Sequence, residues 1–148
     1  MTMTRREMCL LLPGAALSGA AAPIADAGEQ DNSLPSAGFS FEKLTAKSAA
    51  SGAQIREILK GKLATGESLE THATTLPPGA MPHPPHRHVH SEMFCMREGT
   101  LELTVNGKTY SLGPGSVGFV RSNEEHGVKN VGSAPANYFV VEMGPGAS

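Results

Sequence analysis

The chain has 148 residues, a formal net charge of −2 at pH 7, and a composition of 39% hydrophobic and 18% charged residues. This length suits one domain. So small a net charge leaves no electrostatic footprint for nucleic acid or for an anionic membrane surface, so we expect neither as a partner of the mature domain. The 17 Gly and 11 Pro residues favour many turns and therefore many short strands.

The N-terminus has the features of an export signal. Arg5 and Arg6 precede residues 9–25, which carry no charge and are rich in Ala and Leu, and Ala25-Asp26-Ala27 is a small-x-small cleavage site. Pro and Gly interrupt the apolar run, which makes it a poor membrane-spanning helix. We therefore predict a twin-arginine-type signal peptide over residues 1–27 and a periplasmic or secreted protein. An uncleaved anchor and a disordered tail remain alternatives.

Residues 28–38 are small and polar, and we interpret them as a flexible lead to a domain spanning residues 39–148. Cys9 lies in the predicted signal, so Cys95 is the single cysteine of the mature chain and no intramolecular disulfide is possible. Cys95 lies in an apolar run, which indicates a buried, inert thiol rather than a nucleophile.

The rest of the chain has the pattern of short strands separated by turns. Leu101–Val105 alternates with period two, and Asn106-Gly107 directly after it is a strong hairpin signal, so Lys108–Leu112 should pair back onto it. Residues 54–59 fit either a short helical turn or a strand. Further strands are expected at residues 39–44, 69–76, 92–97, 117–120 and 138–142. Many short strands without a convincing long helix predict an all-β sandwich or barrel.

Histidines are concentrated in one stretch of the sequence. His83, His86, His88 and His90 fall within eight residues, and Glu92 follows two residues later. Side chains at i, i+2 and i+4 share one face of a strand, so His86, His88 and Glu92 can all point inward. Burying these polar groups in an apolar barrel is costly unless a metal pairs the charge. Imidazole and carboxylate donors suit a divalent Mn, Fe, Co, Ni, Cu or Zn ion.

These residues resemble two sequence motifs of the cupin superfamily. His86-Arg87-His88, three residues, Glu92, six residues and Gly99 are similar to the first motif. The second motif is matched in spacing by Gly115, five residues, Arg121-Ser122-Asn123, two residues, His126, three residues and Asn130.

Three positions depart from the family pattern. Gly79 lies seven positions before His86, where the family has six, so the approach loop should be one residue longer. Arg121 replaces the usual Pro, and Asn123 replaces the usual turn Gly. Asn tolerates the left-handed backbone conformation better than most residues, so we expect the turn at Asn123 to survive.

The resemblance covers roughly residues 69–142 and implies a single double-stranded β-helix, or jelly-roll, barrel. It also implies that His86, His88, Glu92 and His126 are the ligands of one divalent transition metal, and that the protein is a homodimer paired through its sheets. Met93 and Cys95 would then be outward-facing contacts of such a dimer.

Other residues near the motifs have more than one interpretation. For His83 and His90 a surface position is preferred over ligation, and His72 either lines the cavity or faces water. Period two from Glu92 places Phe94 and Met96 inward, as a wall beneath the metal or simply as core. The acid–base candidates Glu102 and Glu142 are explained equally well by a solvated strand face, and Tyr110 and Tyr138 are expected to be packing residues.

Three His and one Glu leave one or two positions open on a six-coordinate ion, which is typical of a catalytic site. The ion and one carboxylate sum to a charge of +1, which favours an anionic oxygen ligand. The leading hypothesis is a metal-dependent enzyme acting on a small organic molecule, with dioxygenase-type chemistry slightly favoured over isomerase or decarboxylase chemistry. The alternatives are a non-catalytic binding or sensing module and a barrel without metal.

Overall fold

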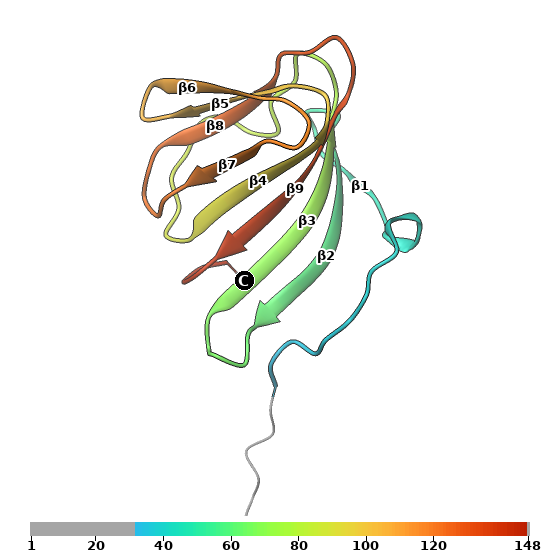
Figure 1. Cartoon of the computed structure of the whole chain (residues 1–148), viewed down its shortest axis with the longest axis vertical. Coiled ribbons are helices and arrows are strands. Elements are labelled where there is room, and N and C mark those ends of the chain that lie inside the picture. The colour runs from blue at the N-terminus through green and yellow to red at the C-terminus, as the bar shows by residue number, and fades with distance from the viewer. Residues whose placement is uncertain (1–31, 148) are drawn as a thin grey trace, which may run out of the picture. The chain divides into compact units, whose positions relative to one another are not determined.

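The computed structural model describes residues 32–147, which form nine strands and one short 3₁₀ helix (Figure 1). The helix is η1 (Phe41–Lys43), and the strands are β1 (Lys47–Ser48), β2 (Gln54–Lys62), β3 (Ser68–Leu76), β4 (Ser91–Glu98), β5 (Leu101–Val105), β6 (Lys108–Leu112), β7 (Val117–Val120), β8 (His126–Asn130) and β9 (Ala136–Met143).

The strands form two antiparallel sheets. One has six strands in the order β1-β2-β3-β9-β4-β7, and the other has three in the order β6-β5-β8. The two sheets enclose one apolar core in the domain drawn in Figure 1. The predicted all-β jelly-roll class is therefore confirmed.

Period-two burial produces this core, because alternate side chains of each strand face the opposite sheet. In β4, Glu92, Phe94 and Met96 are buried while the residues between them are only partly buried. The inward positions predicted for Phe94 and Met96 are confirmed. The sheets approach closely at Gly118 of β7, where an added Cβ would lie 2.7 Å from a methyl group of Leu103.

Two turns follow the predicted chemistry. Asn106 and Gly107 both have positive φ, at 48° and 80°, which is the requirement of a type I′ hairpin between β5 and β6. Asn123 has φ 64°, so it adopts the left-handed conformation expected of it in place of Gly. Both predictions are confirmed.

Some predicted elements differ from the structure. The strand expected at residues 39–44 is wrong: the chain forms a local turn in which the Lys43 and Leu44 amides donate to the carbonyls of Ser40 and Phe41. Strand structure there would require a paired neighbour, and no strand of residues 32–147 pairs with it. The ambiguous residues 54–59 belong to β2. Strand β8 was missed by the pattern analysis.

The predicted signal peptide at residues 1–27 lies outside the described residues, as do residues 28–31 of the predicted lead. From residue 32 onward the chain meets the sheet at Leu34, whose amide donates to the Lys62 carbonyl at 2.7 Å. Within residues 32–147, no helix is both long and apolar enough to cross a membrane.

Candidate metal centre

A cavity of about 330 Å³ lies on the inner side of the six-stranded sheet. Its walls come from β3, β4, β8 and β9 and from the loop between β3 and β4. The lining combines apolar and titratable side chains: His72, Thr74, Pro82, His83, His86, His88, His90, Glu92, Phe94, Val128, Tyr138, Val140 and Glu142. Of the four predicted ligands, His86, His88 and Glu92 line this cavity directly.

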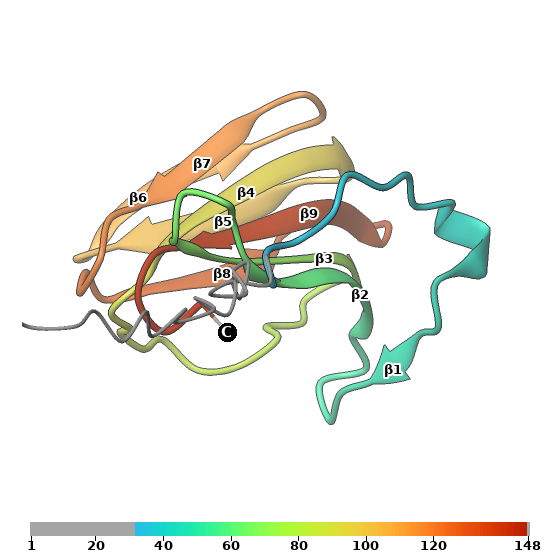
Figure 2. The ribbon, with the colours of Figure 1, turned by 90° about the horizontal axis from the view of Figure 1, so that it is seen from below.

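Three of the predicted ligands converge. One ring nitrogen from each of His86, His88 and His126 lies within 4.8 Å of the others. His126 begins β8, whereas the other two belong to the loop that connects β3 to β4, which runs beside β8 (Figure 2).

The prediction that His86 and His88 lie on one regular strand with Glu92 is wrong. Residues 82–90 contain three prolines, which cannot donate to a strand ladder, and no regular strand forms there. His86 is instead tied to His126 by an isolated antiparallel bridge with two backbone hydrogen bonds of 3.0 Å. This bridge brings the two sequence motifs together.

Backbone carbonyls orient two of the imidazoles. Nδ1 of His88 lies 2.9 Å from the His90 carbonyl oxygen, and Nδ1 of His126 lies 2.9 Å from that of Glu124. A carbonyl only accepts, so each Nδ1 carries a proton and donates it. In the neutral imidazole the lone pair is then on Nε2, the arrangement found in metal-ligating histidines.

Glu92 lies against these lone pairs. Its Oε2 is 2.9 Å from Nε2 of His126 and 3.4 Å from Nε2 of His88, and the side chain is almost fully buried. Two imidazole lone pairs and a carboxylate oxygen are all acceptors, so their approach requires a cation among them, either a proton or a metal ion.

The pKa values of Glu92, His126 and His86 are shifted by burial and by the groups around them. Burial acts to lower the pKa of His126, but the contacts with Glu92 and the Glu124 carbonyl outweigh it, and the pKa rises above its ordinary value. Burial acts to raise the pKa of Glu92, and the adjacent His126 and His88 outweigh it, so the pKa falls. At His86, burial and the neighbouring histidines lower the pKa, which favours the neutral imidazole that a metal needs.

The residues present fit a divalent transition ion. Nδ1 of His86 is buried and has no hydrogen-bond partner, so one nitrogen of the predicted ligand set is buried without a compensating interaction. Three imidazoles with one carboxylate are the borderline donors that such ions prefer. His86, His88 and His126 could therefore hold an ion, with Glu92 beside two of them.

The cavity also contains residues whose role the pattern left open. His90, expected at the surface, is 9% exposed, and its Nε2 lies 3.2 Å from Oε2 of Glu142. The loop returns to β4 at this point and turns the His90 ring inward. His83 is exposed at the cavity mouth, with its ring against that of His86 at 4.2 Å between centroids. Of the two positions considered for His72, the structure shows the first: its side chain lines the cavity.

Only some of the acid–base candidates lie at the cavity. Glu142 lines the cavity, and burial together with the carboxylates of Glu70 and Glu92 raises its pKa to about 7. Glu102 lies between the inward residues Leu101 and Leu103 and faces away from the core. Tyr138 is buried in the cavity wall, whereas Tyr110 is 42% exposed elsewhere.

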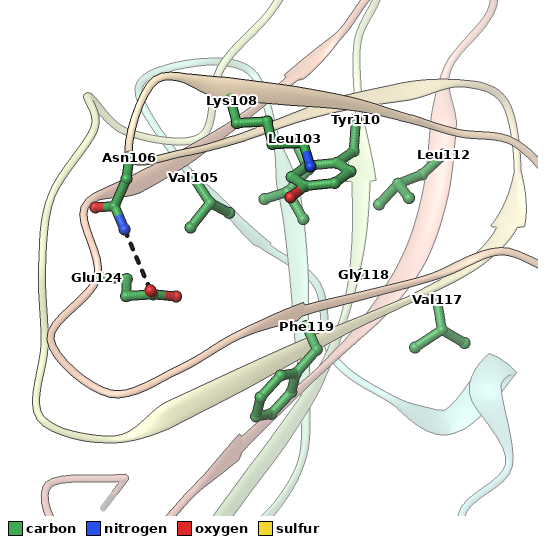
Figure 3. A pocket seen from close by; sticks show the side chains of 10 residues that line it. All are labelled: Leu103, Val105, Asn106, Lys108, Tyr110, Leu112, Val117, Gly118, Phe119 and Glu124. Atoms are coloured by element: carbon green, nitrogen blue, oxygen red, sulfur yellow. Dashed lines mark hydrogen bonds between the residues drawn. The ribbon is translucent and has the colours of Figure 1, made fainter.

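A second hollow, of about 500 Å³, lies between β6 and β7 and shares no lining residue with the first (Figure 3). Leu103, Leu112 and Tyr110 face β7 across it, and Asn106 donates to Glu124 at its rim (3.2 Å). Its lining contains neither histidine nor cysteine, so of these two cavities the histidine-lined one has the side chains suited to bind a transition metal.

Sequence comparisons show which known proteins this chain resembles. The family model of the Cupin domain matches residues 72–142, which include all four predicted ligands. The L-ectoine synthases of Bordetella parapertussis and Bordetella bronchiseptica are each 36% identical over 62 residues, which is 41% of this chain and 47% of theirs. The chain thus spans about half the length of these curated relatives.

Solved structures share the fold. The cupin domain of Schizosaccharomyces pombe Cnp3 has a TM-score of 0.63 at 19% identity, covering 72% of this chain and 73% of that one. KdgF from Halomonas sp. has a TM-score of 0.63 at 16% identity, covering 73% and 94%. This chain therefore matches the Cupin domain in sequence over residues 72–142 and shares its fold with these two structures.

Proposed function

We propose that this protein is a metal-dependent cupin enzyme that acts on a small organic molecule in the histidine-lined cavity. The observation that carries the proposal is the convergence of His86, His88 and His126 within 4.8 Å, from two separate segments, beside the buried carboxylate of Glu92. These four residues would hold one divalent transition ion. The cavity of about 330 Å³ is at the lower end of the size of small-molecule sites.

The chain's own residues prepare the cavity for an oxygen-bearing substrate. When bound, the ion would supply Lewis-acid polarisation of a substrate oxygen. Backbone carbonyls hold His88 and His126 in one tautomer, and Glu92 offsets one unit of the ion's charge. The remaining unit favours a carboxylate or enolate oxygen. Phe94 and Val140 line the wall with apolar surface that limits water around the substrate.

Two reaction classes suit this donor set. One is insertion of dioxygen into an enol or catechol, which the sequence pattern favours slightly. The other is a non-redox reaction such as isomerisation, elimination or decarboxylation of a bound acid. The second class has specific support, because both curated relatives are named as synthases and neither is named as an oxygenase.

The first experiment is elemental analysis of protein purified without chelators, compared between wild type, His86→Ala and His83→Ala. We expect about one ion per chain at the three-histidine centre, lost in His86→Ala and retained in His83→Ala. His83 is a matched control because it is exposed in the same loop and touches the His86 ring. Equal metal content in His86→Ala and wild type would contradict the proposal.

The second experiment separates the reaction classes. Oxygen uptake with enol or catechol substrates would identify an oxygenase, and turnover of hydroxy or keto acids without oxygen uptake would identify the non-redox class. Thermal stabilisation by a ligand with no turnover of any kind would instead indicate a binding or sensing module, and the enzyme proposal would be wrong.

We also propose that the chain is exported after folding, on the basis of Arg5-Arg6 and the small-x-small site that ends at Ala27. A twin-arginine route would let the ion be loaded before export, where availability rather than affinity selects it. Cell fractionation of wild type and an Arg5→Lys, Arg6→Lys variant tests this. Equal export of both proteins would refute it.

A further inference from the structure

A second group of potential metal ligands lies on β3 and β9, outside the predicted ligand set. Glu70, His72 and Glu142 each offer one oxygen or nitrogen atom, and the three atoms lie within 4.8 Å of one another. Glu70 and His72 are two residues apart on β3 and therefore share a face. Glu70 is the direct register partner of Glu142 on β9, which places both carboxylates side by side.

The sheet carries more negative than positive charge at this position. Lys60, Glu70, Glu142 and Glu92 pair in sequence across β2, β3, β9 and β4 and form one row. The ammonium of Lys60 lies 3.0 Å from Glu70, and no second lysine or arginine belongs to the row. Like charges directly opposite each other destabilise a sheet, and burial strengthens the repulsion. A divalent cation would offset it.

His90 is a second, independent feature aimed at this group. It is 9% exposed, its Nε2 lies 3.2 Å from Oε2 of Glu142, and its other ring nitrogen is buried without a hydrogen-bond partner. Its ring also stacks on His88 at 3.6 Å between centroids and 13° between planes. A nearly buried imidazole therefore connects Glu142 to the three-histidine centre.

We propose that Glu70, His72 and Glu142, with His90 beside Glu142, form a second divalent-cation site at the edge of the same cavity, which His72, His90 and Glu142 line. Two carboxylates and one imidazole neutralise a divalent ion and suit Zn, Mn or Co. Glu142 pairs with Glu92 across β9 and β4, and Glu92 contacts His126 and His88, so the second site lies beside the three-histidine centre.

Lys60 is the natural competitor of this ion. Its side chain is 45% exposed, so it can leave Glu70 for solvent when an ion binds. Removing the ammonium should therefore strengthen the second site. A Lys60→Gln variant is expected to bind the second ion about 1.5- to 5-fold more tightly, from the loss of one competing surface ion pair.

The test is titration of the metal-stripped, purified chain with Zn²⁺, followed by calorimetry and by native mass spectrometry. We expect two ions per wild-type chain. A Glu70→Gln, His72→Ala double variant should keep one ion, and His86→Ala should keep the other. Glu102→Gln is the matched control, because it removes a carboxylate from the outward face of β5, and it should keep both ions.

Circular dichroism in the presence of EDTA checks that each variant is folded before titration. One ion per wild-type chain, or a second ion that survives the double variant, would overturn the second site. An unchanged second affinity in Lys60→Gln would also count against it. If His86→Ala kept two ions, the three-histidine centre would be wrong and the second site would stand, so the two failures are distinguishable.

Discussion

The substitution Glu142→Gln gives a quantitative test of the electrostatics in the cavity. Burial and the carboxylates of Glu70 and Glu92 raise the pKa of Glu142 to about 7, from an ordinary value of 4.5. The folded protein thus binds this proton more tightly than the unfolded chain does. The stabilisation is complete below pH 4.5 and is lost as the pH rises through 7. Glutamine keeps the shape and the contact with His90 but cannot ionise.

The magnitude follows from the pKa difference. From 4.5 to about 7, at 1.36 kcal/mol per pKa unit, the upper limit is about 3 kcal/mol. Screening by the water that enters the cavity reduces this to about 1–3 kcal/mol. For a domain of this size, that corresponds to an increase in Tm of about 3–10 °C for the metal-free variant above pH 8. At pH 4.5 the two proteins should be equally stable.

The assay is thermal unfolding of metal-free wild type, Glu142→Gln and Glu102→Gln, followed by circular dichroism between pH 4.5 and 8.5. Glu102 faces away from the core, so its variant should change Tm by less than about 2 °C at every pH, as expected for a surface change of under 0.5 kcal/mol. A lower Tm for Glu142→Gln at pH 8.5, or a gain that does not depend on pH, would refute the reasoning. With Zn²⁺ added, the gain should reverse, because the variant loses a ligand of the second site.

Three further outcomes can be checked. Gly99→Ala should lower the free energy of unfolding, measured with urea, by about 2–4 kcal/mol, because the added Cβ would lie 2.7 Å from a backbone atom at φ +79°. Gly115→Ala has a similar φ of +78° but open space around it, so it should lower the free energy of unfolding by only about 1 kcal/mol. Similar losses in the two variants would contradict the steric argument. Asn130→Ala should lose about 2–4 kcal/mol in the same assay, because the fully buried amide makes three hydrogen bonds to backbone groups, and a loss under 1 kcal/mol would contradict this. The pKa of His126 lies above its ordinary value of 6.5, and that of Glu92 lies below its ordinary value of 4.5. Their ion pair should therefore stabilise the metal-free protein most between pH 4.5 and 6.5, and less as the pH rises through the His126 pKa or falls through the Glu92 pKa. A His126→Gln variant whose loss of stability did not depend on pH would contradict this.

Local sequence patterns were sufficient to predict several strands and turns of the barrel. Period-two alternation identified β5 and the inward side chains of β4, and Asn106-Gly107 predicted the hairpin to β6. These features depend on neighbours within a few residues, so the amino-acid order encodes them directly. The choice of His86, His88 and His126 as a converging set came from motif spacing, since strand parity was the wrong reason.

Only the tertiary structure determined what surrounds these residues. The bridge between His86 and His126 joins segments 40 residues apart, and the pairing of Glu70 with Glu142 joins segments 72 residues apart. Such contacts arise from the register of distant strands, which no local periodicity contains. The same register places Glu142 in the cavity wall, beside His90. Residue types thus indicated the chemistry, and long-range strand pairing decided which of those residues share a site.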